Sequence, residues 1–199
     1  MKLVAALSVC SLFFVLAEGD QPQPCNTPPL LEGEMAVLHL IKNNGWIGRF
    51  AYDSIGKRMY FDRSSFGMNR TLNELNILLF NESVGYRFYP DNRTCVKYPL
   101  LVPFTKFSIP RNATFGGKVY LGTSSVPAAG LLVSFWRSKV HGEFSQLTVT
   151  ESGCVPVSEL SNTKELGWVI ESYFNLSLGI SDPNVFVPPP ECSHLNLNL

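Results

Sequence analysis

Residues 178–192 read Leu-Gly-Ile-Ser-Asp-Pro-Asn-Val-Phe-Val-Pro-Pro-Pro-Glu-Cys, and this stretch decides how the fold is closed. The Asp-Pro-Asn at 182–184 is a turn signal between two apolar runs. The three prolines at 188–190 then hold the chain extended, because proline fixes φ and has no amide donor. A segment with so few backbone hydrogen bonds of its own needs an attachment elsewhere. We therefore expect Cys192 to fasten it to an earlier part of the chain.

The residues that lead into this stretch show the clearest alternation in the sequence. Positions 172–180 place apolar and polar side chains on opposite faces, which is the period of a half-buried strand. The face expected to point inward carries Phe174, Leu176, Leu178 and Ile180. The opposite face, expected to meet solvent, carries Tyr173, Asn175 and Ser177.

Shorter strand patterns occupy most of the preceding chain. Turn signals such as those at 43–45 and 141–142 separate them. Residues 99–115 contain three prolines and predict a long, ordered crossing loop, whereas residues 159–169 fit either a strand or a helical turn. The expected strands cover residues 34–41, 46–53, 58–62, 75–80, 84–89, 95–98, 118–121, 131–139, 143–151 and 172–180. This pattern predicts a mainly β fold, either an antiparallel sandwich or a strongly curved sheet.

The composition favours one folded domain without a charged partner. A length of 199 residues suits a single domain. Apolar residues make up 45% and charged residues 16%, which is unlike a disordered chain. Basic and acidic residues number 16 each, so the formal net charge is zero and no basic patch argues for nucleic acid.

The N-terminus is typical of a secretory signal peptide. Lys2 precedes an apolar run at 3–16, and Val15-Leu16-Ala17 fits the small-residue cleavage rule. The run is shorter than the roughly 20 residues that a membrane-spanning helix needs. We predict a signal peptide at 1–17, with cleavage as late as 19, and a single secreted, extracellular domain at 18–199 with no transmembrane segment.

Cysteines and glycosylation sequons agree with export. The cysteines outside the predicted signal are Cys25, Cys95, Cys154 and Cys192. An even number in a secreted chain predicts two disulfides, and the spacing alone allows three pairings. The Asn-x-Ser/Thr sequons, which predict a glycoprotein with these acceptors at the surface, are Asn69, Asn81, Asn92, Asn112 and Asn175.

Several motifs of this chain resemble the ependymins and ependymin-related proteins. The most specific is Leu-Gly-Ile-Ser-Asp-Pro-Asn-Val-Phe-Val-Pro-Pro at 178–189. Gln-Pro-Cys at 23–25 and Gly-Cys-Val-Pro-Val at 153–157 support it through their order. Ile-Pro-Arg-Asn-Ala-Thr-Phe at 109–115 resembles the glycosylated loop of that family. The resemblance covers the whole mature chain.

This resemblance implies a secreted or lysosomal glycoprotein that forms a homodimer. It implies two stacked, curved antiparallel sheets, similar to bacterial lipoprotein carriers with a half-barrel fold, around an apolar pocket. It also implies binding of fatty acids or other lipids, and of calcium. The family pairing would join Cys25 to Cys154 and Cys95 to Cys192. A third bridge of the vertebrate relatives has no counterpart, since neither 64–65 nor the residues after Cys192 contain cysteine.

Large apolar side chains are the candidates for lining such a pocket. A filled core needs the same residue types, so the sequence alone does not separate a core from a pocket. The face of 131–139 that points inward is also open, because Trp136 lies on one face and Val133 and Phe135 on the other. The pocket candidates are Trp46, Phe50, Phe61, Leu79, Phe88, Val133, Phe135, Phe174 and Leu176.

Two classes of function fit this sequence. No Gly-x-Ser-x-Gly, His-Glu-x-x-His, phosphate-loop or EF-hand spacing occurs in the sequence. We therefore predict a protein that is not an enzyme. We predict no cofactor beyond a structural or weakly bound Ca²⁺, whose ligands are unknown. One class is a secreted carrier of hydrophobic molecules, which predicts a cavity of several hundred cubic ångströms. The alternative is an extracellular matrix or cell-adhesion glycoprotein that acts through calcium, glycans and protein contacts, which predicts a filled core.

Overall fold

The computed structural model describes residues 22–67, 71–140 and 142–193. The predicted signal peptide and the sequon at Asn69 lie outside these residues. The described chain forms eleven strands and two short 3-10 helices. These elements are β1 (Leu30–His39), β2 (Asn44–Asp53), β3 (Arg58–Phe66), β4 (Leu72–Leu79), β5 (Val84–Tyr89), β6 (Thr94–Pro99), β7 (Thr114–Gly122), β8 (Gly130–Val140), β9 (Glu143–Thr150), β10 (Pro156–Thr163), β11 (Gly167–Leu178), η1 (Pro183–Phe186) and η2 (Pro190–Cys192).

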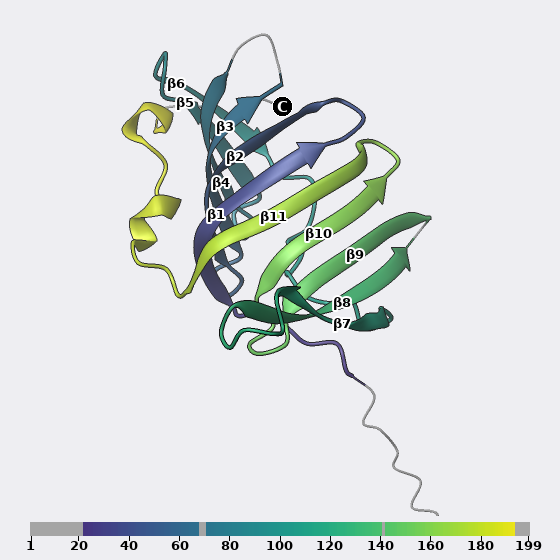
Figure 1. The fold of residues 1–199 in the computed structure, drawn as a ribbon. Helices are drawn as coiled ribbons and strands as arrows, with labels where there is room; N and C mark the ends of the chain where they lie inside the picture. The colour runs from purple at the N-terminus through teal and green to yellow at the C-terminus, as the bar shows by residue number, and fades with distance from the viewer. Residues whose placement is uncertain (1–21, 68–70, 141, 194–199) are drawn as a thin grey trace, which may run out of the picture.

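All eleven strands belong to one antiparallel sheet, in the order β6-β5-β4-β3-β2-β1-β11-β10-β9-β8-β7. Figure 1 shows this sheet strongly curved, with β3 to β6 turned away from β9 and β10. The prediction of a mainly antiparallel β fold is confirmed. Where two stacked sheets were expected, the hydrogen bonding is continuous, because β1 pairs with β2 along one edge and with β11 along the other.

Tight turns build the first half of the sheet as a meander. The residues that enter the left-handed region of backbone conformation in these turns are Asn43, Lys57, Ser83 and Arg93. Such positive φ values match the turn to the twist of the flanking strands in a short hairpin. Each strand from β1 to β6 therefore pairs with the next one along the chain, in a register set locally.

The ambiguous residues 159–169 form strand rather than helix. β10 runs from Pro156 to Thr163, a turn follows, and β11 begins at Gly167. β10 pairs with β9 on one side and β11 on the other. The hydrogen bonds to these two neighbours hold β10 as a strand. Its own serine- and glutamate-containing sequence has too weak an alternation to predict one.

A bulge changes which side chains of β11 point inward. The register between β1 and β11 shifts at Gly33, and Asn175 opposite has a φ of 50°. A Cβ on Gly33 would lie 2.9 Å from the carbonyl oxygen of Phe174, so only glycine fits this close approach. Tyr173 is consequently buried and Phe174 is 44% exposed, the reverse of the expected faces. The alternation rule fails here because the bulge inserts one residue.

The inner face of the sheet, defined as the face that carries Phe50, Tyr52 and Tyr173, is covered by the crossing loop at 100–113. Two aromatic side chains of this loop stack on Tyr52, with ring centroids 4.5 Å away for Phe107 and 5.9 Å away for Phe104. The backbone N–H of Phe107 also donates to the Tyr52 hydroxyl at 3.1 Å. The buried residues of this inner core are Leu31, Met35, Val37, Phe50, Tyr52, Met59, Val169 and Tyr173.

The opposite, outer face is covered by the C-terminal segment at 179–193, which lies outside the sheet beside β3 to β6 in Figure 1. Phe186 is 3% exposed and packs against Ile77, while the guanidinium of Arg58 lies 4.3 Å from the centre of its ring. A disulfide joins Cys192 to Cys95 on β6. The attachment expected for Cys192 is therefore present, and it fixes the segment against the first half of the sheet.

Candidate functional site

A cavity of about 610 Å³ lies between the crossing loop and the inner face of the second half of the sheet. It is partly open to solvent. Strands β8 to β11 supply one wall, and the loop supplies much of the other. The lining residues are Thr27, Met59, Phe80, Val102, Pro103, Thr105, Lys106, Phe107, Ser108, Pro110, Ser138, Glu143, Phe144, Ser145, Leu147, Pro156, Glu159, Ser161, Thr163, Glu171 and Tyr173.

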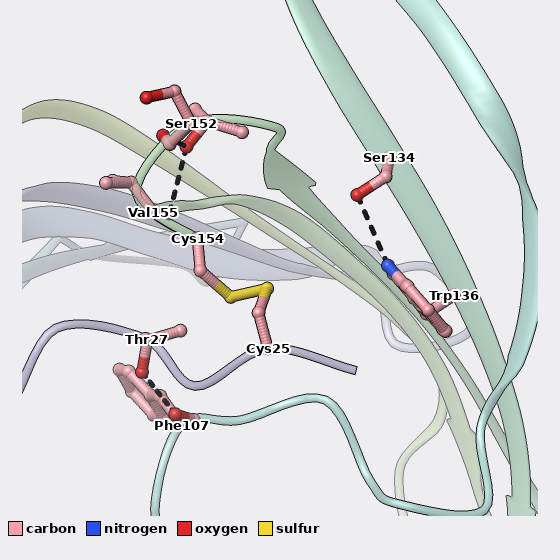
Figure 2. The surroundings of a disulfide bond; sticks show 9 residues. Cys25, Thr27, Phe107, Ser134, Trp136, Ser152, Cys154 and Val155 are labelled. Atoms are coloured by element: carbon pink, nitrogen blue, oxygen red, sulfur yellow. Dashed lines mark hydrogen bonds between the residues drawn. A yellow bond between two sulfur atoms is a disulfide. The ribbon is translucent and has the colours of Figure 1, made fainter. Parts of the chain in front are cut away.

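The wall formed by the crossing loop is tied to the N-terminal lead-in. Figure 2 shows the disulfide between Cys25 and Cys154, and the hydroxyl of Thr27 donating to the carbonyl oxygen of Phe107. The backbone N–H of Ile109 donates to the carbonyl oxygen of Cys25 at 3.4 Å. The lead-in, the loop and the turn after β9 are thus held together at one end of the cavity.

A buried tryptophan supports this junction. Trp136 on β8 is 4% exposed and packs with Ile109 and Val149. Its indole N–H donates to the hydroxyl of Ser134 at 3.2 Å (Figure 2). The face of β8 that was left open by the sequence is therefore settled, since Trp136 points inward.

Two carboxylates face each other on the strand wall of the cavity. Glu159 on β10 and Glu171 on β11 are direct partners in the antiparallel register, a position in which Cβ atoms lie about 5 Å apart. The hydroxyl of Ser145 donates to Glu159 (Oγ to Oε1, 2.6 Å), and the hydroxyl of Tyr173 donates to Glu171 (Oη to Oε2, 2.9 Å). Each carboxylate is thus held by one hydroxyl group.

Among the described residues, no cation is paired with the two carboxylates of this pair. Burial raises the pKa of Glu171, and the charge of Glu159 raises it further, against a smaller lowering by the Tyr173 hydrogen bond. Burial also raises the pKa of Tyr173 well above its ordinary value, so its hydroxyl keeps the proton that it donates. Neither carboxylate forms an ion pair within the described residues. The other charged lining residues, Lys106 and Glu143, are exposed.

A second polar group occupies the inner face of β3 to β5. Glu74 is 6% exposed and forms ion pairs with Arg63 and with Arg87, the latter at 3.6 Å. The side-chain oxygen of Asn76 accepts from Arg87 at 3.2 Å. Here the carboxylate is balanced by cations within the protein, and these residues do not line the cavity. We interpret this group as structural.

None of the nine pocket candidates predicted from the sequence lines the cavity. Trp46, Phe50, Phe61 and Leu176 lie in or against the inner core instead. The other candidates lie away from the cavity for three reasons. Leu79 packs against the outer-face cluster, and Phe88 is the strand partner of Leu75 in that cluster. Val133 and Phe135 lie on the face of β8 opposite to the inward-pointing Trp136, and Phe174 is turned outward by the bulge. The strand wall is formed largely by serine, threonine and glutamate, which the apolar pattern of the sequence does not single out.

The described sequon asparagines lie at the surface. Asn81, Asn92, Asn112 and Asn175 are all exposed, so each acceptor is accessible. Whether these acceptors carry glycans stays a prediction.

Calcium, which the family resemblance implies, has no fitting site in the described chain. Residues 22–67, 71–140 and 142–193 contain no group of three or more acidic, histidine or cysteine side chains placed to hold an ion. Within the same residues, no helix has the length and apolar character that crossing a bilayer requires.

Comparison with known proteins identifies the family. The ependymin family model matches residues 69–192. Ependymin-2 of Carassius auratus is 31% identical over 197 residues, which cover 96% of this chain and 89% of the relative. Mammalian ependymin-related protein 1 of Rattus norvegicus is 27% identical over 189 residues, covering 92% and 82%. The chain belongs to the ependymin family, and this membership supports a secreted glycoprotein.

A solved structure shares the fold. An uncharacterized conserved protein from Thermus thermophilus superposes with a TM-score of 0.55, over 83% of this chain and 88% of that one. The sequence identity is 8%, so the likeness concerns the fold alone.

Proposed function

We propose that this protein is a secreted glycoprotein that binds hydrophobic or amphiphilic molecules in the cavity between the crossing loop and β8 to β11. The cavity volume of about 610 Å³ is the observation that carries the proposal. It falls within the range of about 300–1,000 Å³ that is common for small-molecule sites. The alternative, a matrix or adhesion glycoprotein without a stored ligand, requires a filled core at this place.

The lining supports a ligand with both an apolar and a polar part. Met59, Phe80 and Leu147 offer hydrocarbon and aromatic surface to an alkyl chain. Burial of each methylene group contributes about 0.8 kcal/mol and needs no directional contact. Hydroxyl and carboxylate groups on β9 to β11 offer partners for a polar end. This mixed lining corresponds better to an amphiphile than to a purely apolar molecule.

Native mass spectrometry tests the proposal directly. The full chain would be secreted from eukaryotic cells, deglycosylated enzymatically and measured before and after solvent extraction. We expect an adduct of lipid mass that is lost on denaturation and is restored by adding a single-chain amphiphile. A protein that is free of adducts and also fails to bind added fatty acids, alcohols, amines and lysophospholipids at micromolar concentration would overturn the carrier proposal in favour of the matrix one.

A cavity-filling variant makes the test specific to this site. Ser161 lines the cavity, whereas its neighbour Asn162 does not and lies on the other face of β10. Ser161→Trp should reduce the amount of bound adduct, because an indole takes up space that the ligand needs. Asn162→Trp is the matched control and should retain the adduct. Equal retention by both variants would place the ligand elsewhere.

We also propose a homodimer that forms through β7. This strand is an edge of the sheet, and edge strands present unpaired backbone groups. Val119, Tyr120 and Leu121 on it are each at least 42% exposed. Light scattering should give a dimer mass for the wild type and a monomer mass for Tyr120→Lys. A monomeric wild type would contradict this assembly.

A further inference from the structure

The acid pair Glu159–Glu171 lies on the wall of the cavity where a ligand's polar end could be received. Both side chains line the cavity, together with their hydroxyl partners Ser145 and Tyr173. Each hydroxyl donates to one oxygen of one carboxylate, which leaves further acceptor capacity on both groups.

Within the described residues, no cation forms an ion pair with either of these carboxylates. Like charges directly opposite each other on neighbouring strands destabilise a sheet. Carboxylates removed from water are normally paired with a cation. Elsewhere on the same face the protein follows that rule, because Glu74 lies between Arg63 and Arg87. The cavity pair has no such partner in the described chain, and its open side is the cavity.

We propose that the cavity selects amphiphiles with a cationic, hydrogen-bond-donating head group, such as a primary alkylammonium, and that Glu159 and Glu171 together receive this group. An ammonium has three donors and no acceptor, so it can bond to both carboxylates at once. A fatty acid anion would instead approach two negative groups. The inference rests on the proposed function, since it names the ligand class of the same cavity.

The other charged and titratable residues at the site do not reverse this preference. Tyr173 is held as a donor to Glu171 and is neutral. Glu143 adds a third negative charge to the lining, and Lys106 on the crossing loop is the one cation among the lining residues described. Both are exposed, where water and salt screen their influence.

Three ligands of equal chain length test the inference. Dodecylamine, dodecanol and dodecanoate differ only in the polar end. Their affinities for the solvent-extracted, deglycosylated full chain would be measured by isothermal titration calorimetry at neutral pH, below the concentrations at which they form micelles. Because an ammonium brings a full positive charge and three donors to the two carboxylates, whereas an alcohol brings one neutral donor, we expect the amine to bind about tenfold or more tighter than the alcohol. The carboxylate should bind most weakly.

Glutamine variants identify the residues responsible. Glu159→Gln, Glu171→Gln and the double variant keep side-chain size and remove negative charge. We expect the double variant to lose about tenfold in dodecylamine affinity and to lose less in dodecanol affinity, so that the preference for the amine disappears while dodecanol binding still reports an intact cavity. Glu165→Gln, in the exposed turn between β10 and β11, is the control and should change neither affinity.

The outcomes separate this inference from the proposed function. If dodecanol and dodecanoate bind as tightly as dodecylamine, or if the double variant keeps the preference for the amine, the inference is overturned and the carrier function stands. If none of the three ligands binds, the inference is overturned, and the carrier function falls with it when lysophospholipids also fail to bind. Preference for the amine that disappears in the double variant supports both.

Discussion

The ionised form of Glu171 is stabilised by the hydrogen bond from the Tyr173 hydroxyl and destabilised by its desolvation next to Glu159. Its carboxylate is half-buried beside that of Glu159, and both the desolvation and the neighbouring charge raise its pKa above the ordinary value. A carboxyl group whose pKa is raised by folding costs stability in its ionised form. This cost is present at pH values above the folded-state pKa and disappears as the pH falls below the unfolded-state value.

Replacing this carboxylate should therefore stabilise the unliganded protein. Glu171→Gln keeps an oxygen that can accept from Tyr173 and removes the charge. At neutral pH we expect the melting temperature to rise by about 2–4 °C, the change that about 1 kcal/mol produces at this chain length. The difference should shrink as the pH is lowered through the raised pKa. Thermal unfolding followed by circular dichroism across this pH range measures both effects.

Glu165→Gln provides the comparison, since Glu165 is exposed in a turn and should leave the melting temperature within about 1 °C of the wild type. A lower melting temperature for Glu171→Gln at neutral pH would contradict the electrostatic cost assigned to this residue.

The acid pair was not predictable from the sequence. Glu159 lies in a segment that fits a helical turn as well as a strand, so its face could not be assigned. Glu171 immediately precedes the alternating run whose bulge reverses the expected faces of Tyr173 and Phe174. A glutamate in a strand is usually a solvated residue, and only the register of β10 with β11 brings these two together.

At the scale of elements, the two disulfides attach covers to opposite faces of the sheet. Cys95–Cys192 holds the C-terminal segment on the outer face, and Cys25–Cys154 holds the lead-in near the crossing loop on the inner face. The cysteine pairs are separated by 97 and 129 residues. In the chain-entropy description, loops of this size give about 4–5 kcal/mol of stabilisation each, less any strain.

Removing the outer disulfide should uncover the outer face without emptying the cavity. In the double variant of Cys95→Ser and Cys192→Ser, we expect faster hydrogen exchange in 180–193 and in β3 to β5, because Phe186 is no longer held against Ile77. Binding of dodecanol should stay within about threefold of the wild-type affinity, since the segment does not line the inner cavity. Unchanged exchange in 180–193 would show that packing alone fixes the segment.

Removing the inner disulfide should weaken ligand binding in the cavity and leave the outer face covered. In the double variant of Cys25→Ser and Cys154→Ser, the lead-in loses its covalent attachment beside Thr27 and Phe107, which both line the cavity. We expect dodecanol affinity to fall by about tenfold, because part of the binding energy is spent on ordering the loop. Exchange in 180–193 should remain as in the wild type. Full retention of affinity would mean that the aromatic stacking on Tyr52 positions the loop without the bridge.

The elements themselves were predictable where pattern and turn chemistry agree. Asn43 lies in a turn with positive φ, as the hairpin signal at 43–45 indicates, and residues 99–115 are largely the loop that their prolines predict. The pairing of Cys25 with Cys154 and of Cys95 with Cys192 was implied only by the family, because the spacing allowed three arrangements. β10 was missed since its hydrogen bonds come from its neighbours rather than from its own residue pattern.

At the scale of the whole molecule, a bound ligand should stabilise the fold. The cavity is lined from both the sheet and the crossing loop, so a ligand contacts parts of the chain that separate on unfolding. At a free ligand concentration of 100 times the dissociation constant, linkage gives about 2.7 kcal/mol, or about 5–10 °C in melting temperature for a domain of this length. Differential scanning calorimetry with dodecylamine measures the shift.

Ser161→Trp should show a smaller shift than Asn162→Trp under the same conditions, because only the first side chain enters the cavity. An increase in melting temperature of equal size in both variants would indicate binding outside the cavity.

The antiparallel β class of the fold could be predicted from the sequence, but the joining of all strands into one sheet could not. Period-two patterns and short spacings indicated antiparallel β structure. The difference between two sheets and one depends on β1 pairing with β11, for example Leu31 with Leu178, and no local pattern specifies a contact between residues so distant in sequence.

This central pairing has a consequence for synthesis of the chain. β1 to β6 can pair as a meander soon after they leave the ribosome, but the free edge of β1 must wait for β11, which is translated last among the strands. At about 5–20 residues per second, that wait is on the order of ten seconds. During it the newborn protein presents an open strand edge to other chains, a recognised route to aggregation. Molecular chaperones that bind extended segments would protect the nascent half-sheet in this interval, and so would glycans at the predicted acceptors Asn69, Asn81 and Asn92.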